Sequence, residues 1–231
     1  MNDNCNKYKI NIYIITIMKY INLKIKPYSL WLSYNMLNHK LITDMLPRGM
    51  EIANIKLSEN YETIGPKLLF NCYNIESRWM KGSRLEILTI ARKGNNFHFV
   101  ILDCLTNTGQ WDPINRVKPP NSIINFNYNQ EILNYEVIDY SKKKLIITGE
   151  TQQLITLDKR FAVESNYHCY FKNSQISVKL DFNEENVMRP VRKIKLLNLT
   201  NDLWAEYRTE TPEILFMHEH EMNFKASLPF Y

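Results

Sequence analysis

Glu86 and Lys118 are the residues of this chain whose types and settings best fit chemistry on a small molecule. Glu86 lies within an apolar run, where an unpaired carboxylate is costly. Lys118 lies in a basic turn that ends in two prolines, and Arg116 precedes it by two positions. A lysine amine can attack a carbonyl carbon, and a nearby carboxylate can move protons. The two residues therefore suggest nucleophilic chemistry on a carbonyl compound.

A purely structural interpretation of the same residues stays open. Glu86 could form an ion pair with Arg84 or Arg92 at the mouth of a barrel, and Lys118 could be a solvated lysine before Pro119. On residue spacing alone, this structural interpretation is favoured over the catalytic one.

The element that must position Glu86 is a hairpin. Two apolar runs, residues 85–91 and 97–104, flank the polar link 92–96, which contains Gly94 and two asparagines. Glycine and asparagine tolerate positive φ better than other residues, so the link favours a tight reversal. Both runs are mostly apolar, which is typical of strands with both faces at least partly buried. The pattern predicts a β-hairpin in the core.

Residues 93–103, which read KGNNFHFVILD, are followed by Gly109 and the basic, proline-containing turn. This order resembles the acetoacetate decarboxylase family, in which a K-G-x-x-x-H-x-x-x-L-D strand leads through a glycine to a Pro-Lys-Lys turn with the Schiff-base lysine. Residues 82–86, GSRLE, resemble the family's G-x-x-x-E, which supplies an active-site glutamate. The resemblance extends with gaps from residue 28 to the C-terminus. It implies a mainly β, single-domain acetoacetate decarboxylase-like β-barrel with a few short helices.

The resemblance also implies roles for individual residues. Lys118 would form an iminium with a keto-acid-type substrate, and Glu86 would orient the substrate or move protons. A free lysine has a pKa of about 10.4, so burial and a nearby cation such as Arg116 would have to lower it. Arg116 could instead bind a substrate carboxylate. The expected substrate-binding residues are Arg116, Arg48, Trp111, Phe97 and Phe99.

Three places depart from the family pattern. Val117-Lys118 stands for two adjacent lysines, so a strict alignment puts Val117 on the nucleophile and Lys118 on the lysine that perturbs it, whereas a one-residue shift makes Lys118 the nucleophile. Thr43 replaces an active-site arginine, and Gln110 and Trp111 replace charged residues after the glycine. We therefore expect a lyase or related enzyme whose substrate is not acetoacetate itself. The alternative is a non-catalytic barrel that binds a small apolar or carboxylate ligand in a similar pocket.

Composition limits the other possibilities. The chain has 231 residues, of which 45% are hydrophobic and 23% charged, as expected for one soluble domain. Only 6 glycines are present and no phosphate-binding loop motif occurs. The net charge of +5 is spread along the chain, so we expect no nucleic-acid partner. A small molecule is the expected partner, without a cofactor, and a homo-oligomer remains open.

The four cysteines are isolated, which favours a reducing, cytoplasmic compartment. We expect no metal, because His218 and His220 form a pair at strand spacing, whereas a catalytic zinc needs three protein ligands. This pair is interpreted as the polar outer face of a late strand.

Residues 1–17 are expected to be an N-terminal extension, either an extra strand or disordered, before a domain at 18–231 that starts at Met18. The apolar run at 10–17 is too short to span a membrane.

The remaining pattern predicts short strands joined by turns. A short helix is expected at 39–46 with Asn38 as its cap, after a strand at 28–34. The other predicted strands are residues 133–141, 144–151, 166–171, 175–182, 191–199, 203–208 and 214–224.

Overall fold

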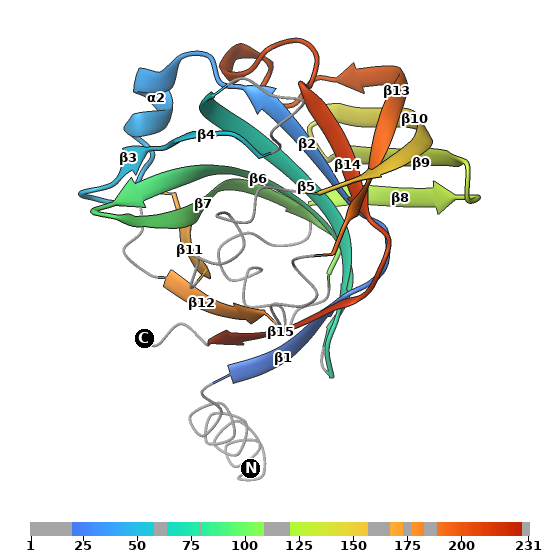
Figure 1. Ribbon diagram of the computed structural model, residues 1–231, viewed down its shortest axis with the longest axis horizontal. Helices are drawn as coiled ribbons and strands as arrows, with labels where there is room; N and C mark the ends of the chain where they lie inside the picture. The colour runs from blue at the N-terminus through green and yellow to red at the C-terminus, as the bar shows by residue number, and fades with distance from the viewer. Residues whose placement is uncertain are drawn as a thin grey trace, which may run out of the picture.

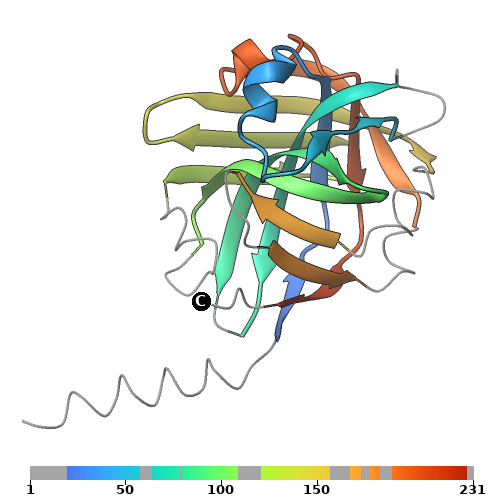
Figure 2. The ribbon, with the colours of Figure 1, turned by 90° about the vertical axis from the view of Figure 1, so that its left-hand side faces the viewer.

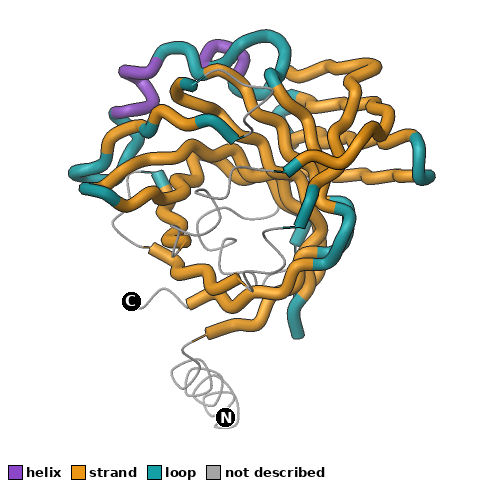
Figure 3. Tube along the Cα trace, viewed as in Figure 1, coloured by secondary structure: helices purple, strands orange, loops and turns teal. Residues whose placement is uncertain are grey.

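The computed structural model describes residues 20–57, 64–78, 80–108, 121–156, 167–172, 177–182 and 189–227. Strands dominate these residues, and the two short helices lie together at one end (Figures 1 and 3). The helices are α2 (His39–Thr43) and the 3-10 helix η2 (Ala205–Tyr207). The strands are β1 (Tyr20–Ile25), β2 (Ser29–Asn35), β3 (Glu51–Ile52), β4 (Asn54–Ile55), β5 (Gly65–Glu76), β6 (Lys81–Lys93), β7 (Asn96–Thr106), β8 (Ser122–Tyr128), β9 (Ile132–Asp139), β10 (Lys144–Ile155), β11 (Tyr167–Phe171), β12 (Ser177–Phe182), β13 (Val191–Asn201), β14 (Ile214–His218) and β15 (Met222–Ser227).

Hydrogen-bonded strand pairs run round a closed ring. β6 pairs with β7, and β7 pairs in parallel with β11. The ring continues through β12, β15, β1 and β5, and β5 returns to β6. Figure 1 looks into this ring, with β6 and β7 on one side and β1 and β15 on the other. The expectation of a mainly β barrel with few helices is confirmed.

β5 also starts the second part of the sheet. Its second edge pairs with β1 near its end and with β2 along Lys67–Cys72. From β2 the sheet continues through β14, β13, β10, β9 and β8. Figure 2 shows β9 and β10 running across the direction of β1 and β5. A large apolar cluster fills the space between them, with contributions from Leu68, Phe70 and Cys72 of β5 and from Leu133, Tyr135 and Val137 of β9.

The other face of β5 is also covered. On β1 the exposed side carries Lys24, which forms a 2.9 Å ion pair with Glu221. The opposite side is apolar and buried, and we call it the inner face. Its residues on β1, β5 and β15 are Leu23, Ile25, Tyr73, Ile75, Met222, Phe224 and Ala226.

The predicted core hairpin is β6 and β7. Gly94 has a φ of +61° in the turn, which glycine adopts without strain. Leu85 and Ile87 face the large cluster, whereas Leu88 and Ile90 belong to a separate cluster with Leu69. Side chains alternate along a strand, so Leu88 and Ile90 project from the opposite side of β6, and a register shift with β7 lies between Ile87 and Leu88. Both faces of this hairpin are buried, as its apolar sequence predicted.

Three local predictions were wrong, since the strand predicted at 214–224 is divided into β14 and β15. The helix α2 ends at Thr43 rather than at residue 46, and Asn38 makes no side-chain cap, because its amide donates to the carbonyl oxygen of Glu206 instead. The predicted strand at 203–208 is the 3-10 helix η2. The Arg208 guanidinium holds this segment by donating to the carbonyl oxygens of Leu203 and Asn201. These contacts lie within the segment itself and leave no periodic signal in the sequence.

The expected N-terminal extension at 1–17 and the expected start at Met18 lie outside the described residues. Among the residues that the structure does describe, no helix is long and apolar enough to cross a membrane.

Gly82, near the start of β6, provides a test of backbone packing. A Cβ at this position would lie 2.8 Å from Cα of Thr108 and 2.9 Å from its Cγ2. We expect Gly82→Ala to lower the free energy of unfolding by about 2 kcal/mol, because the backbone of Thr108 must move. Denaturant titration measures the change.

Gly65→Ala is the matched control, since its Cβ would meet nothing within 4 Å. It should change stability by less than about 1 kcal/mol. Equal effects of the two substitutions would contradict the close approach of β6 and Thr108.

The ion pair of Lys67 and Glu213 provides a second test. Lys67 is fully buried, and it contacts both the Glu213 carboxylate and Oδ1 of Asn35. We expect Lys67→Met to destabilise the fold by about 3–5 kcal/mol, because a largely buried carboxylate loses its lysine partner. The double variant Lys67→Met/Glu213→Gln should recover most of this loss in thermal unfolding.

Lys195→Met removes an exposed pair with Glu150 and should cost less than about 1 kcal/mol. A loss at Lys67 as small as that at Lys195 would show that the buried pair contributes no more than a surface one.

Candidate functional site

Glu86 lies in the middle of β6, directly opposite Asn71 of β5 and Cys104 of β7. Its exposed fraction is 8%. The Tyr73 hydroxyl donates a 2.6 Å hydrogen bond to Oε1 of Glu86, and Nη1 of Arg84 lies 3.7 Å from the same oxygen. The ion pair with Arg84, which the structural interpretation suggested, is therefore present, together with a tyrosine donor.

Two partners of Glu86 stabilise a negative charge on its carboxylate. Arg84 is 4% exposed, and its guanidinium also donates to the Tyr73 hydroxyl at 3.4 Å. Burial, and then the Glu86 charge, raise the pKa of Tyr73 well above its usual value, so the phenol keeps its proton and remains a donor. A cation and a protonated phenol on one carboxylate stabilise its negative charge. A fixed, ionised carboxylate can accept a proton or orient a polar substrate.

Polar residues continue from Glu86 across the inner face. The Ser29 hydroxyl of β2 donates a 3.1 Å hydrogen bond to Oδ1 of Asn71. His218 of β14 pairs in register with Ser29. We call this row the polar band, and it consists of Arg84, Glu86, Tyr73, Asn71, Ser29 and His218. Apolar residues lie on both sides of it, with Trp31 and Phe216 on one side and Ile25 and Ile75 on the other.

His218 corrects an expectation from the sequence. It was interpreted as part of a polar outer face, but its exposed fraction is only 6%. Its ring makes an edge contact with Phe216, with the centroids 6.0 Å apart. Burial, and then the neighbouring His220, lower the pKa of His218 to about 4, so it is neutral near pH 7. Alternation along β14 places it on the side of Phe216, which explains the burial.

Within the described residues, no group of three histidine, cysteine or acidic side chains could hold a metal ion. The expectation that the protein uses no metal stays a prediction.

The two flanks of the segment 109–120 are held beside Glu86. The amide nitrogen of Asn121 donates to the carbonyl oxygen of Thr106 at 3.0 Å, and its side-chain Oδ1 accepts from the Thr106 amide at 3.0 Å. Its Nδ2 lies 3.4 Å from the carbonyl oxygen of Cys104. Thr106 and Cys104 are the residues paired with Arg84 and Glu86. Both flanks are thus attached to the strand that faces the carboxylate.

Lys118, Arg116 and Trp111 lie outside the described residues, as does Val117. Their predicted roles stay predictions.

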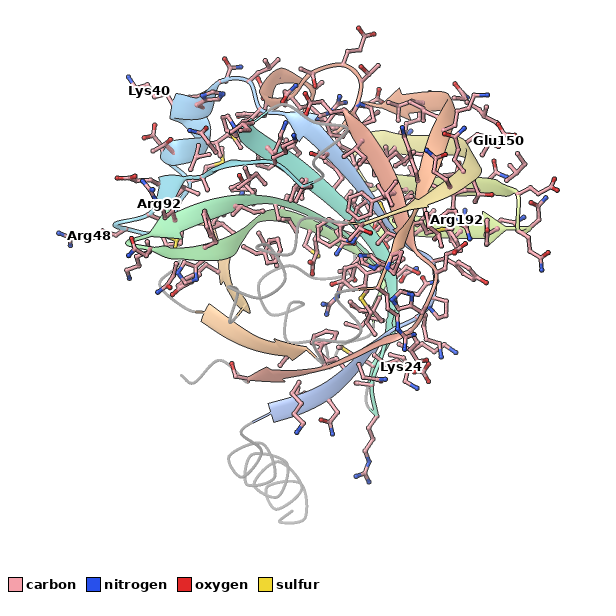
Figure 4. All side chains as sticks on the ribbon, in the orientation of Figure 1. Lys24, Lys40, Arg48, Arg92, Glu150 and Arg192 are labelled. Carbon is pink, nitrogen blue, oxygen red and sulfur yellow. The ribbon has the colours of Figure 1, made fainter. Side chains whose placement is uncertain are left out.

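The other predicted site residues fall in two places. Phe97 and Phe99 are half-buried in the apolar cluster beside the polar band, and Phe99 lies 6.4 Å from Trp31 between ring centroids. Arg48 and Thr43 are exposed. Figure 4 shows Arg48 near Arg92, at the end of β6 away from Glu86. Arg48 is therefore not part of the polar band.

Sequence reasoning missed Tyr73, Asn71 and Ser29. The signal that could have found the first two is an antiparallel pairing of β5 with β6, in which Asn71 lies opposite Glu86 and Tyr73 opposite Arg84. Such a pairing follows once residues 65–76 are recognised as a strand that turns directly into β6.

Comparisons with known proteins agree with this architecture. No protein-family model matches the chain, and no curated protein sequence does. Solved structures with a similar fold cover most of it. The acetoacetate decarboxylase from Legionella pneumophila subsp. pneumophila str. Philadelphia 1 is 12% identical, with a TM-score of 0.54 over 93% of this chain and 88% of that one.

An acetoacetate decarboxylase-like enzyme from Sphingomonas wittichii RW1 is 6% identical, with a TM-score of 0.56 over 91% of both chains. The enduracididine biosynthesis enzyme MppR complexed with pyruvate is 8% identical, with a TM-score of 0.54 over 90% of this chain and 87% of that one. At these identities the likeness concerns the fold alone. The chain thus has the acetoacetate decarboxylase-like fold that the resemblance in its sequence implied.

Proposed function

We propose that this protein is a small-molecule enzyme that resembles acetoacetate decarboxylase and forms a Schiff base between Lys118 and a keto-acid-type substrate. Carbon–carbon lyase or related chemistry would follow. The observation that carries the proposal is the buried Glu86 carboxylate, which contacts the Tyr73 hydroxyl and the Arg84 guanidinium. Glu86 lies on β6, which pairs with β7, the strand that leads into the segment that contains Lys118.

Chain connectivity supports a meeting of Lys118 and Glu86. Lys118 precedes Asn121 by three residues, so their Cα atoms lie within about 11 Å of each other. Asn121 is hydrogen-bonded to Thr106 and lies against Cys104, the residue opposite Glu86. We therefore propose that the Lys118 amine approaches the Glu86 carboxylate.

The chemistry would proceed through an iminium. The neutral Lys118 amine attacks the substrate carbonyl carbon, and the carbonyl oxygen leaves as water after proton transfers in which Glu86 can take part. The positive iminium nitrogen then accepts the electron pair of the carbon–carbon bond between the neighbouring carbon and its outer substituent. That substituent leaves as carbon dioxide or as a carbonyl compound, and an enamine remains. Protonation of the enamine carbon and hydrolysis by water release the product and the lysine. Arg116 would lower the pKa of the lysine or bind the substrate carboxylate.

The proposed substrate is a keto acid other than acetoacetate. By the resemblance, Val117-Lys118 stands where the decarboxylases have two adjacent lysines, and Trp111 stands just after the glycine, where they have a charged residue. The bulk and apolar surface of Trp111 would change the shape of the site. The structure of MppR with pyruvate supports pyruvate as the first probe for this chain.

Trapping with borohydride tests the nucleophile. Reduction in the presence of pyruvate or a β-keto acid should leave an adduct that mass spectrometry locates on Lys118. Lys118→Ala should lose the adduct and keep its melting temperature, whereas Lys143→Ala, at the exposed turn after β9, should keep both.

An adduct that survives Lys118→Ala would move the nucleophile to another residue. Failure of every carbonyl acid to form an adduct would overturn the enzyme proposal. Measurable binding of a small carboxylate in that case would support the non-catalytic barrel.

Glu86→Gln tests the role of the carboxylate. The amide keeps the size of the side chain but is a much weaker base, so the rate of adduct formation should fall about a hundredfold. Glu136→Gln is the control. Glu136 lies on β9, and its carboxylate accepts a hydrogen bond from the exposed Asn125 side chain. Adduct formation at the wild-type rate in Glu86→Gln would contradict a proton-transfer role.

A further inference from the structure

β8 is the last strand of the second part of the sheet, and the structure describes a neighbour on only one of its two edges. It pairs with β9 along all of its residues, and no described strand pairs with its other edge. Figure 1 shows β8 as the outermost strand of this part of the sheet, beyond β9. An edge of this kind presents a row of backbone N–H and C=O groups to which another strand can bond.

The hydrogen bonds at the start of β8 show which backbone groups point outward. The carbonyl oxygen of Asn121 accepts from the Tyr140 amide at 3.0 Å, so the Asn121 carbonyl points toward β9. Along an antiparallel ladder the bonded and non-bonded pairs alternate, so every second residue from Asn121 onward bonds to β9. The residues between them direct their backbone groups away from β9, and these residues are Ser122, Ile124, Phe126 and Tyr128.

The edge of β8 lacks the features with which proteins usually protect a free edge. Such edges commonly carry charged side chains or proline, or belong to very short strands. β8 has seven residues that read SIINFNY, with no charge and no proline. At the opposite end of the strand order, β3 has only two residues, and its Glu51 carries a charge that pairs with Arg92 at 3.2 Å. The edge of β8 is therefore open to pairing with another strand.

The sequence of β8 is complementary to a second copy of itself. An antiparallel pair that uses all seven residues has its two-fold axis at Asn125. Ile124 then lies opposite Phe126 of the second copy, and both residues direct their backbone groups toward the new neighbour. A β-branched residue opposite an aromatic one is a favourable cross-strand pair. Because β8 carries no charge, no like charges from the two strands meet across the axis.

Apolar side chains flank this edge on both faces of the sheet. On one face Ile123 is 55% exposed, and Tyr140 at the start of the ladder is 71% exposed. On the other face Tyr28 is 37% exposed, and its ring centroid lies 4.7 Å from that of Tyr128. A second copy placed at the edge would remove part of this apolar surface from water, which favours association.

We propose that the chain forms a two-fold symmetric dimer in which β8 pairs antiparallel with β8 of a second copy, with Asn125 at the axis. The second part of the sheet would then continue from one copy into the other. The inference does not rest on the proposed function, because it assigns no role to Lys118 or Glu86.

Two double variants test the register of this dimer. Ile123 would lie opposite Asn127 of the second copy, and both side chains are exposed. Ile123→Lys/Asn127→Lys places like charges opposite each other on both sides of the axis, whereas Ile123→Lys/Asn127→Glu places opposite charges there. In sedimentation equilibrium the wild type and the Lys/Glu variant should have twice the mass of the chain. The Lys/Lys variant should show a dissociation constant at least about tenfold higher.

Leu197→Lys/Asn198→Lys is the charge-matched control for the Lys/Lys variant. Both side chains are exposed on β13, which is separated from β8 by β10 and β9. The control should dimerise as tightly as the wild type. A wild type that stays monomeric at about 100 μM would overturn the inference, as would equal dimerisation of the Lys/Lys and Lys/Glu variants.

Amide hydrogen exchange, measured by NMR on the wild type, tests the same edge without any substitution. The amides of Ile124 and Phe126 point away from β9, so they should exchange at least about tenfold more slowly when the protein is concentrated enough to dimerise. The Ile123 and Asn125 amides bond to β9 in both states and should keep their exchange rates. Exchange at Ile124 and Phe126 that does not depend on protein concentration would contradict pairing at this edge.

Discussion

The architecture depends on β5 being hydrogen-bonded along both of its edges. Inside a protein, backbone N–H and C=O groups must be paired, and a long strand with both faces buried needs neighbours on both sides. β6 occupies one edge, and β2 followed by β1 occupies the other. This arrangement closes the ring, starts the second part of the sheet, and sets Asn71 and Tyr73 of β5 opposite Glu86 and Arg84 of β6.

Burial explains why the polar residues gather in one band. A lone carboxylate on the inner face would lose its hydration without compensation, whereas Glu86 has the Tyr73 hydroxyl and the Arg84 guanidinium as partners. Each partner in turn needs another group, and Arg84 contacts Sδ of Met80 as well as Tyr73. Charge is concentrated at the Glu86 end, while the His218 end is neutral. The band thus offers different chemistry at its two ends.

Much of the fold could be predicted from the sequence because its signals are local. The hairpin of β6 and β7 has a glycine in its turn, and the hairpins at β9–β10 and β11–β12 also lie where the pattern placed them. Glu86 could be singled out because an acidic residue stands in an apolar run. These features depend on residues within a few positions of one another.

The rest of the site depends on contacts between distant segments. Ser29 and Asn71 are 42 residues apart, and no pattern in either strand shows that they meet. The polar residues around His218 favoured an outer face, yet every residue of β14 is buried. Arg208 organises its segment through carbonyl groups, which any residue could supply. Pairings across the sheet, rather than residue types, fix these positions.

Because both flanks of the segment 109–120 are attached to β7, the segment between them could be replaced by a different one. Asn121 and Thr108 are held by contacts with Thr106, Cys104 and the start of β6, and none of these contacts uses a residue within the segment. A segment of different sequence or length could therefore be grafted between them without loss of these particular contacts. Doubling the length of a flexible loop raises the entropic free-energy cost of closing it by only about 0.6 kcal/mol. The segment, and with it the proposed nucleophile, could thus be replaced while the strand that carries Glu86 is kept.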